Sequence, residues 1–209
     1  YTTSIISLCK KIGGIELLAI CVDYDYLNLF PKHFNGIEII GFNEALYKYS
    51  DAFYVIAIGY KKMRNRKRIY LKLIENNLEL ITLISPNAYV STKNIGRGCI
   101  IFDGVVIEND TVIHDNVTIW SNVTICHDVN IDEHCFIAAG TTIGGFTKVG
   151  ELSFVGFNST LIDEVKVGNE CLIGACSLIN ANIDDFSKCY GIPAKLVNKI
   201  DIKTGVCVS

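Results

Sequence analysis

A histidine followed directly by an aspartate, His127-Asp128, is the pair of side chains in this chain best suited to chemistry. A histidine with a pKa near neutrality can take a proton from an amine or hydroxyl nucleophile, and a carboxylate beside it can orient the ring or hold its charge. Gly145 lies eighteen residues after His127, and a glycine lets a backbone N–H approach a developing oxyanion closely. If the fold brings these three residues together, they have the components of an acyl-transfer site.

The element that must position them is a six-residue repeat. Over residues 95–184, fifteen consecutive hexads begin with Ile, Leu or Val, and their fifth residue is small or β-branched. This period predicts a coil of three short strands per turn, with the first residue of each hexad pointing inward and eighteen residues completing a turn. Neighbouring strands lie about 4.8 Å apart. His127 and Gly145 should therefore lie one strand spacing apart on the same edge.

Glycine recurs at the second hexad position, where we expect it to serve the tight corners of the coil. These glycines are Gly96, Gly144, Gly150, Gly156, Gly168 and Gly174. Cysteines separated by multiples of eighteen residues should share one inward edge, where a thiol acts as a small apolar filler and a metal site is a weak interpretation. These cysteines are Cys99, Cys135, Cys171 and Cys189.

The chain before the repeat follows a different period. Its apolar runs favour strands over residues 15–22, 37–40, 54–58 and 78–84, and helix-like patterns occupy residues 3–11 and 64–76. This alternation predicts a small parallel α/β domain. The expected domains are residues 1–86, ending at Pro86, then residues 87–197 for the coil, and a tail over residues 198–209 without an assignable pattern.

Composition excludes several classes of protein. The chain has 209 residues, half of them apolar, so it can bury a core, and its net charge of −3 gives little electrostatic support for nucleic-acid binding. The longest apolar stretch, near residues 15–22, is too short to cross a bilayer, so we expect no membrane association. Nine cysteines without a CxxC motif or a leader favour reduced thiols in a cytoplasmic protein.

Several motifs resemble those of the NeuD/PglD-type sugar acyltransferases, a family of hexapeptide-repeat enzymes. The matching stretches are Cys-His-Asp-Val-Asn-Ile at 126–131, Phe-Ile-Ala-Ala-Gly at 136–140, Gly-Gly at 144–145, Phe-Val-Gly at 154–156 and Gly-Ile-Pro-Ala-Lys at 191–195. With the α/β region in front, the resemblance covers nearly the whole chain. It implies a Rossmann-like N-terminal domain, a left-handed parallel β-helix, and a homotrimer with active sites between subunits.

The resemblance also implies an activity: acetyl transfer from acetyl-CoA to the amino group of a nucleotide-linked 4-amino-4,6-dideoxy sugar of the viosamine kind. His127 would be the general base and Asp128 its partner, with the Gly145 N–H near the thioester carbonyl. Coenzyme A would run along the groove between two subunits. The groove residues implied by the family motif are Gly191, Ile192, Pro193, Ala194 and Lys195.

For the nucleotide sugar, the expected contacts are Asp23 and Gly59, which close two strands of the α/β region, and Trp120. Trp120 precedes His127 by seven residues and would line the sugar pocket or pack at a trimer interface. Two departures from the family pattern stand out. Phe136 lies where many members have a second histidine, and the chain begins after the point where members have a phosphate-binding glycine turn, so we expect it to be part of a longer chain.

Three alternatives to an N-acetyltransferase can be considered from the sequence, and two of them stay open. Sugar O-acetylation of the sialic-acid type is not separated from N-acetylation by the sequence, and a non-catalytic trimeric scaffold remains a second possibility. A γ-type carbonic anhydrase, with zinc held by three histidines, is disfavoured because His114, His127 and His134 differ by 13 and 7 residues rather than by whole coils. We therefore expect no metal, and we interpret His114-Asp115 as a surface pair.

Overall fold

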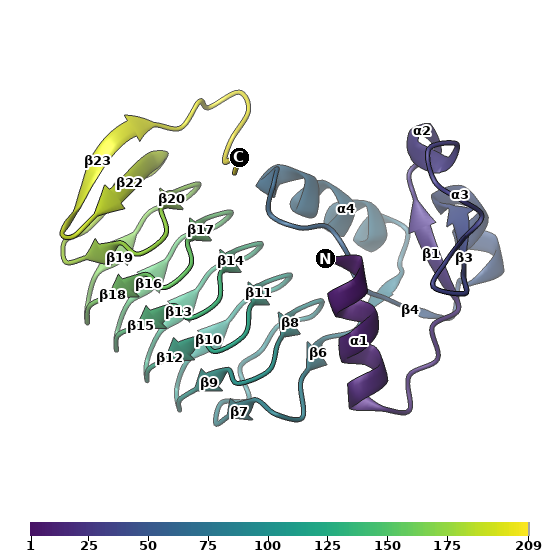
Figure 1. Cartoon of the computed structure of the whole chain (residues 1–209), viewed down its shortest axis with the longest axis horizontal. Coiled ribbons are helices and arrows are strands. Elements are labelled where there is room, and N and C mark those ends of the chain that lie inside the picture. Colours follow the sequence, from purple (N-terminus) through teal and green to yellow (C-terminus); the bar gives the residue numbers. More distant parts are fainter. Residues whose placement is uncertain (209) are drawn as a thin grey trace.

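The computed structural model describes residues 1–208. It consists of an α/β unit that lies against a long coil of stacked parallel strands, as Figure 1 shows. In this view α1 and α4 lie next to the coil, while β1, β3 and α3 are farther out. Within the described residues, no helix is long and apolar enough to cross a membrane.

The α/β unit contains four helices. They are α1 (Thr2–Ile12), α2 (Tyr24–Leu27), α3 (Phe42–Lys48) and α4 (Met63–Glu75). The two helices expected from apolar spacing, over residues 3–11 and 64–76, are confirmed as α1 and α4 to within one residue at each end. α1 buries Ile5, Leu8 and Cys9 on the face that packs against the coil, and it ends at Gly13, whose φ of 76° no helical residue adopts.

The strands of this unit form two small sheets. They are β1 (Ala19–Val22), β2 (His33–Phe34), β3 (Ile37–Gly41), β4 (Phe53–Tyr54) and β5 (Glu79–Leu80). β1 pairs with β3 and β4 pairs with β5, both in parallel as expected, but β2 pairs antiparallel with β3. The reason is the Asn35-Gly36 turn, in which both residues have positive φ, the conformation that closes a tight hairpin.

The coil is built from two-residue strands, one for nearly every hexad. They are β6 (Leu83–Ile84), β7 (Tyr89–Val90), β8 (Ile100–Ile101), β9 (Val106–Ile107), β10 (Val112–Ile113), β11 (Thr118–Ile119), β12 (Thr124–Ile125), β13 (Asn130–Ile131), β14 (Phe136–Ile137), β15 (Thr142–Ile143), β16 (Lys148–Val149), β17 (Phe154–Val155), β18 (Thr160–Leu161), β19 (Lys166–Val167), β20 (Leu172–Ile173) and β21 (Leu178–Ile179). They form three parallel sheets. From β8 to β21 the register is eighteen residues, as in Thr124↔Thr142, whereas β6 and β7 pair at seventeen residues, as in Leu83↔Ile100. The predicted period of the coil is confirmed.

The inside of the coil is filled as the hexads predict. First-position residues such as Ile125 and Ile143 are fully buried, and so are fifth-position residues such as Val123. The four cysteines spaced by multiples of eighteen residues are also buried in this core, as apolar filler. β6 precedes the expected boundary at residue 86 and already pairs with β8; the boundary itself stays a prediction.

The corners differ from expectation in one respect. The left-handed conformation falls on the fourth hexad position, as at Asp128 and His134, and not on the second-position glycines. Those glycines are required because the coils stack closely: a Cβ on Gly150 would lie 2.6 Å from the carbonyl carbon of Gly168. Glycine at the second position therefore allows a close approach between coils rather than a special backbone conformation.

The C-terminal part closes the coil and returns to the α/β unit. β22 (Ser187–Gly191) and β23 (Ala194–Lys199) form an antiparallel hairpin on β20. The tail that follows, which has no recognisable sequence pattern, then packs between the two parts: Val206 is fully buried, and its carbonyl accepts the N–H of Met63 at 3.1 Å. Ser209 lies outside the described residues.

Candidate active site

His127 and Asp128 form a hydrogen-bonded pair at one corner of the coil. Nδ1 of His127 lies 2.9 Å from Oδ2 of Asp128. A carboxylate oxygen accepts hydrogen bonds and does not donate them, so Nδ1 carries the hydrogen and the neutral ring keeps its free lone pair on Nε2. Sequence neighbours in a strand point to opposite faces, but Asp128 has a φ of 57°. This left-handed corner brings both side chains to the same side.

Gly145 lies directly above the histidine ring, one coil along. A Cβ added to Gly145 would lie 2.9 Å from Cε1 and 3.2 Å from Nε2 of His127. The stacking that the eighteen-residue spacing predicts is therefore present, and the absent side chain leaves room for the ring. The ring edge also contacts Phe146, with 5.2 Å between ring centroids at 85°.

The N–H of Gly145 has a partner that the sequence did not suggest. It donates a hydrogen bond of 2.9 Å to Oδ1 of Asp163, one coil farther on. On the other side, the backbone N–H of His127 donates to Oε2 of Glu108 at 3.0 Å. The corner thus carries three carboxylates around one histidine: Glu108 from the preceding coil, Asp128 from the same coil, and Asp163 from the coil beyond Gly145.

These carboxylates act on the charge of His127. The hydrogen bond to Asp128 raises the pKa of His127, and the charges of Asp128, Glu108 and Asp163 add to this effect, because each favours the imidazolium form. The side chain is 47% exposed, so water moderates the shift. Within the part of the chain that the structure describes, Nε2 of His127 has no hydrogen-bond partner. A half-exposed histidine with a carboxylate on Nδ1 and an unpaired Nε2 can take a proton from a nucleophile and hold the resulting charge.

Known proteins with the same architecture identify the class. A family model described as "Bacterial transferase hexapeptide (six repeats)" matches residues 92–126 and 110–145. The acetyltransferase domain of PglB from Neisseria gonorrhoeae, solved with acetyl coenzyme A, is 25% identical, with a TM-score of 0.84 and 93% of each chain covered. PerB from Caulobacter crescentus, solved with CoA and GDP-perosamine, is 25% identical over 94% of this chain and 92% of that chain, with a TM-score of 0.83.

The chain is a hexapeptide-repeat acyltransferase. WeeI from Acinetobacter baumannii has the same fold, with a TM-score of 0.83 at 15% identity over 93% of this chain and 94% of that chain. The resemblance inferred from the motifs is therefore confirmed for the fold and for the enzyme class, while the roles of individual residues stay predictions.

Trp120 of this acyltransferase lies where the coil meets α1. Its ring stacks on Tyr1, with centroids 5.5 Å apart, and on Phe136 at 5.8 Å. Phe136 is fully buried in this cluster, so the position where relatives have a second histidine is apolar core here. Trp120 also lines a hollow of about 440 Å³ whose α1 side presents hydroxyl groups, including those of Ser4 and Ser7.

The two other substrate candidates are in different surroundings. A Cβ on Gly59 would lie 3.8 Å from the side chain of Tyr1. Because Tyr1 also stacks on Trp120, Gly59 and Trp120 lie on either side of the same tyrosine. Asp23 faces α4 instead, where its two oxygens accept hydrogen bonds from Arg68 and Lys72 at 2.8 and 3.0 Å. Burial opposes ionisation of Asp23, but these two cations outweigh it and lower the pKa of the carboxyl.

The motif at residues 191–195 spans the tip of the β22–β23 hairpin, from the last residue of β22 to the first two residues of β23. None of these residues lines the hollow beside α1. Ile192 at the tip of this turn is 74% exposed. An exposed hairpin tip at the end of the coil is accessible to a long cosubstrate or to a second subunit. Within one chain these residues are not next to His127. The hairpin pairs with β20 near the C-terminal end of the coil, whereas His127 follows β12, which belongs to another sheet.

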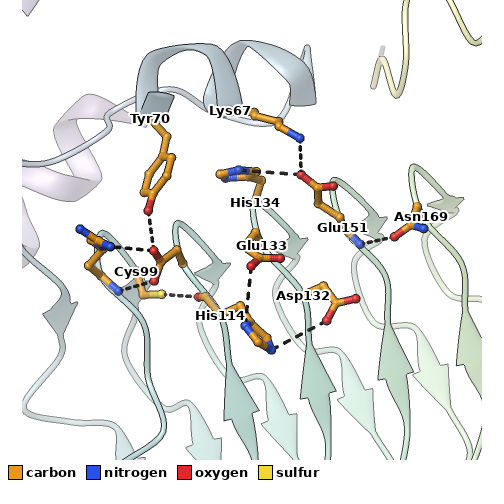
Figure 2. Close-up of polar contacts among 11 residues, drawn as sticks. Lys67, Tyr70, Cys99, His114, Asp132, Glu133, His134, Glu151 and Asn169 are labelled. Carbon is orange, nitrogen blue, oxygen red and sulfur yellow. Dashed lines mark hydrogen bonds and ion pairs between the residues drawn. The ribbon is translucent and has the colours of Figure 1, made fainter. Parts of the chain in front are cut away.

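The interpretation of His114-Asp115 as one surface pair is wrong. His114 does face outward, with ring nitrogens 3.9 and 3.8 Å from Asp132 and Glu133 (Figure 2). Asp115 instead accepts a hydrogen bond from the hydroxyl of Tyr70, which belongs to α4. The two neighbours lie at a corner and point away from each other. The sequence holds no signal for this, because Tyr70 comes from a different element.

His134 is a further residue that sequence reasoning left unassigned. It is buried between the coil and α4, where Nδ1 lies 2.9 Å from the amide nitrogen of Asn116 and Nε2 lies 3.9 Å from Glu151, which also pairs with Lys67 (Figure 2). Burial lowers the pKa of His134 to about 4, so the ring is neutral at ordinary pH. Its place is the junction of the two parts rather than the acyl-transfer corner.

The three coil histidines do not converge. His114 faces Asp132 and Glu133, His127 faces Asp128, and His134 faces Asn116. Across residues 1–208, no group of three or more His, Cys, Asp or Glu side chains is arranged to hold a metal ion.

Proposed function

We propose that this acyltransferase moves an acetyl group from acetyl-CoA to the amine of a nucleotide-linked 4-amino-4,6-dideoxy sugar, with His127 as the general base. The observation that carries the proposal is the hydrogen-bonded pair His127-Asp128 above Gly145, in a fold shared with PglB, solved with acetyl coenzyme A, and with PerB, solved with CoA and GDP-perosamine.

In the proposed reaction, the lone pair of the sugar amine attacks the carbonyl carbon of the thioester and forms a C–N bond. The carbonyl electrons move to oxygen, and Nε2 of His127 takes the proton that the nitrogen loses. When the tetrahedral intermediate collapses, the C–S bond breaks, and the thiolate of coenzyme A leaves and takes up a proton. Asp128 holds the imidazolium that forms between these steps.

Gly145 has two parts in this proposal. Its missing side chain allows the ring of His127 to lie over the backbone. Its N–H is the donor that the family resemblance assigns to the thioester carbonyl, but here this N–H is donated to Asp163. It can stabilise an oxyanion only if the carbonyl oxygen replaces or shares this carboxylate contact.

Substrate binding is proposed on two surfaces. Residues 191–195, on the exposed hairpin, would contact acetyl-CoA, and the hollow beside Trp120 would hold the sugar, because an indole face and hydroxyl groups suit a hexose. Gly59, next to Tyr1, and Asp23 would contact the nucleotide. Asp23 can do so while paired, since each carboxylate oxygen accepts more than one hydrogen bond.

We further propose a homotrimer in which two subunits complete each site. Trp120 precedes β12 and His127 follows it, so the two side chains stand at opposite ends of one side of the coil, and the hollow beside Trp120 is not lined by His127. A sugar held at Trp120 would therefore meet the base of a neighbouring subunit. Co-expression of His127→Ala and Trp120→Ala chains tests this, since mixed trimers should regain activity that neither variant has alone.

The enzyme assay measures release of free thiol from acetyl-CoA with UDP-, dTDP- and GDP-linked 4-amino sugars and with a sialic acid as the hydroxyl acceptor, using wild-type protein and the His127→Ala variant. Release with one nucleotide series, lost in the variant, supports the proposal and names the substrate class. Release only with a hydroxyl acceptor of the sialic-acid type would assign O-acetylation instead. A folded protein that transfers acetyl to no acceptor would favour the scaffold.

A further inference from the structure

Asp163 stands one coil beyond Gly145 at the corner that holds His127. One of its oxygens, Oδ1, accepts the N–H of Gly145 at 2.9 Å, and among residues 1–208 its other oxygen has no hydrogen-bond partner. Asp163 and His127 are both exposed residues. In the general-base chemistry described above, the charge of Asp163 enters only by raising the pKa of His127, to which it contributes less than Asp128 and Glu108 do.

The same backbone contact occurs elsewhere in the coil with a neutral side chain. Oδ1 of Asn169 accepts the N–H of Glu151 at 2.9 Å, with the same eighteen-residue separation as Asp163 and Gly145. An amide oxygen is therefore sufficient to cap such a corner. Aspartates cap other corners as well, since Asp115 accepts the N–H of Arg97 and Asp185 accepts the N–H of Asn169. The negative charge at Asp163 is therefore not needed for the backbone contact, and what distinguishes Asp163 from these caps is its position at the corner of His127.

The three charged side chains that raise the pKa of His127 are all carboxylates. Asp128, Glu108 and Asp163 all act on the ring as carboxylates, and His127 is the single basic group in this set. Negative charge near the attacking atom stabilises attack by an amine more than attack by a hydroxyl group. An amine that attacks a thioester builds positive charge on its nitrogen before the proton leaves, whereas a hydroxyl that attacks as its proton moves to a base builds much less.

We propose that Asp163 is a specificity-determining residue that makes this acyltransferase select an amine over a hydroxyl acceptor. The inference deepens the proposed function and rests on it. The spare oxygen of Asp163 attracts the acceptor as an ammonium ion, which loses one proton to solvent before its lone pair attacks, and it then stabilises the positive charge that develops on the nitrogen during attack. It therefore decides, at the same site, between the N-acetylation and O-acetylation that the sequence left open.

The test compares Asp163→Asn with wild-type protein on two acceptors, GDP-perosamine and its counterpart with a 4-hydroxyl group in place of the amine. Because the asparagine preserves the backbone contact seen at Asn169, the thermal midpoint should not change. We expect kcat/KM for the amine to fall about tenfold, with little change for the hydroxyl sugar, since the lost interaction is with a developing positive charge. The ratio of the two values should therefore fall about tenfold.

A matched control is Asn169→Asp, which adds a carboxylate at an equivalent corner on another edge of the coil and should leave the ratio unchanged. An equal fall on both acceptors, or an unchanged ratio in Asp163→Asn, would overturn the inference while leaving the proposed acyl transfer intact. Failure of the proposed function looks different, because wild-type protein would then release no thiol with any acceptor.

Binding provides a second readout that does not depend on turnover. Calorimetric titration with the two sugars should show tighter binding of the amine to wild-type protein, and loss of this preference in Asp163→Asn. An amine preference that is absent in wild-type protein, or that persists in the variant, would count against the role of Asp163. The preference should also weaken as salt rises, because the group is exposed.

Discussion

Oδ2 of Asp128 lies 2.9 Å from Nδ1 of His127, although the two residues are adjacent in the chain. The left-handed φ of 57° at Asp128 makes this contact possible, since an extended backbone would send the two side chains to opposite faces. The contact between His127 and Asp128 therefore depends on a corner of the coil.

Replacing His127 with alanine should lower kcat by about 10²- to 10⁴-fold, the contribution expected of a general base. The thermal midpoint should hardly change, because the side chain is 47% exposed and lies outside the coil core. Thiol-release kinetics and thermal unfolding measure the two effects. His114→Ala is the matched control, since this histidine is also half-exposed on the coil but faces other carboxylates; a similar loss of activity there would remove the special role of His127.

Replacing Asp128 with asparagine should shift the pH profile of kcat/KM. The hydrogen bond and charge of Asp128 raise the pKa of His127, and a base works in its neutral form, so wild-type activity should rise as the pH rises through this pKa. Without the charge the pKa falls, and the acidic limb should move to lower pH. The maximal kcat should also drop about a hundredfold. Asparagine accepts the left-handed backbone, so the fold should persist; an unmoved acidic limb would contradict the assignment.

Replacing Gly145 with alanine should damage activity more than stability. The new Cβ would lie 2.9 Å from Cε1 of His127, and this ring is exposed and can move aside, so kcat should fall about a hundredfold through misplacement of the base. Gly150→Ala provides the opposite case. There the new Cβ would lie 2.6 Å from backbone of the next coil, and the thermal midpoint should fall clearly. Comparison of kcat and thermal midpoint in both variants separates the two effects.

Replacing His134 with asparagine should make stability less sensitive to acid. Burial lowers the pKa of His134 to about 4 in the folded protein, while an unfolded histidine titrates near 6.5. Between these values the unfolded chain binds the extra proton, so stability is lost as the pH falls from about 6.5 toward 4. The charged side chains around His134 are Arg66, Lys67, Glu133 and Glu151.

This loss should be smaller in His134→Asn, measured as the difference in thermal midpoint between pH 7 and pH 5. Asparagine is compatible with the φ of 63° at this position, so the variant should fold, although at pH 7 it should be less stable because the packing against Tyr70 is lost. A drop between the two pH values equal to that of wild-type protein would show that other groups dominate.

Much of the coil and part of the site could be predicted from spacing alone. The placement of His127 over Gly145 followed from a register of eighteen residues, and the burial of Ile125 and Cys135 followed from their hexad positions. Such predictions succeed because every coil repeats the same local geometry. The Asn-Gly pair at residues 35–36 is a sequence signal for a tight turn, and it could have predicted the antiparallel β2–β3 hairpin.

The sequence by itself determined the β-helix, its register and the placement of His127 beside Gly145, because a strict six-residue period is a local property that is repeated in every hexad. Only the tertiary structure decided which contacts those residues make. Asp163 accepts a hydrogen bond from the N–H of Gly145, and Asp115 accepts one from the hydroxyl of Tyr70. In the tail, the carbonyl of Val206 accepts the N–H of Met63. These pairings join segments far apart in the chain, and packing at corners and junctions selects them.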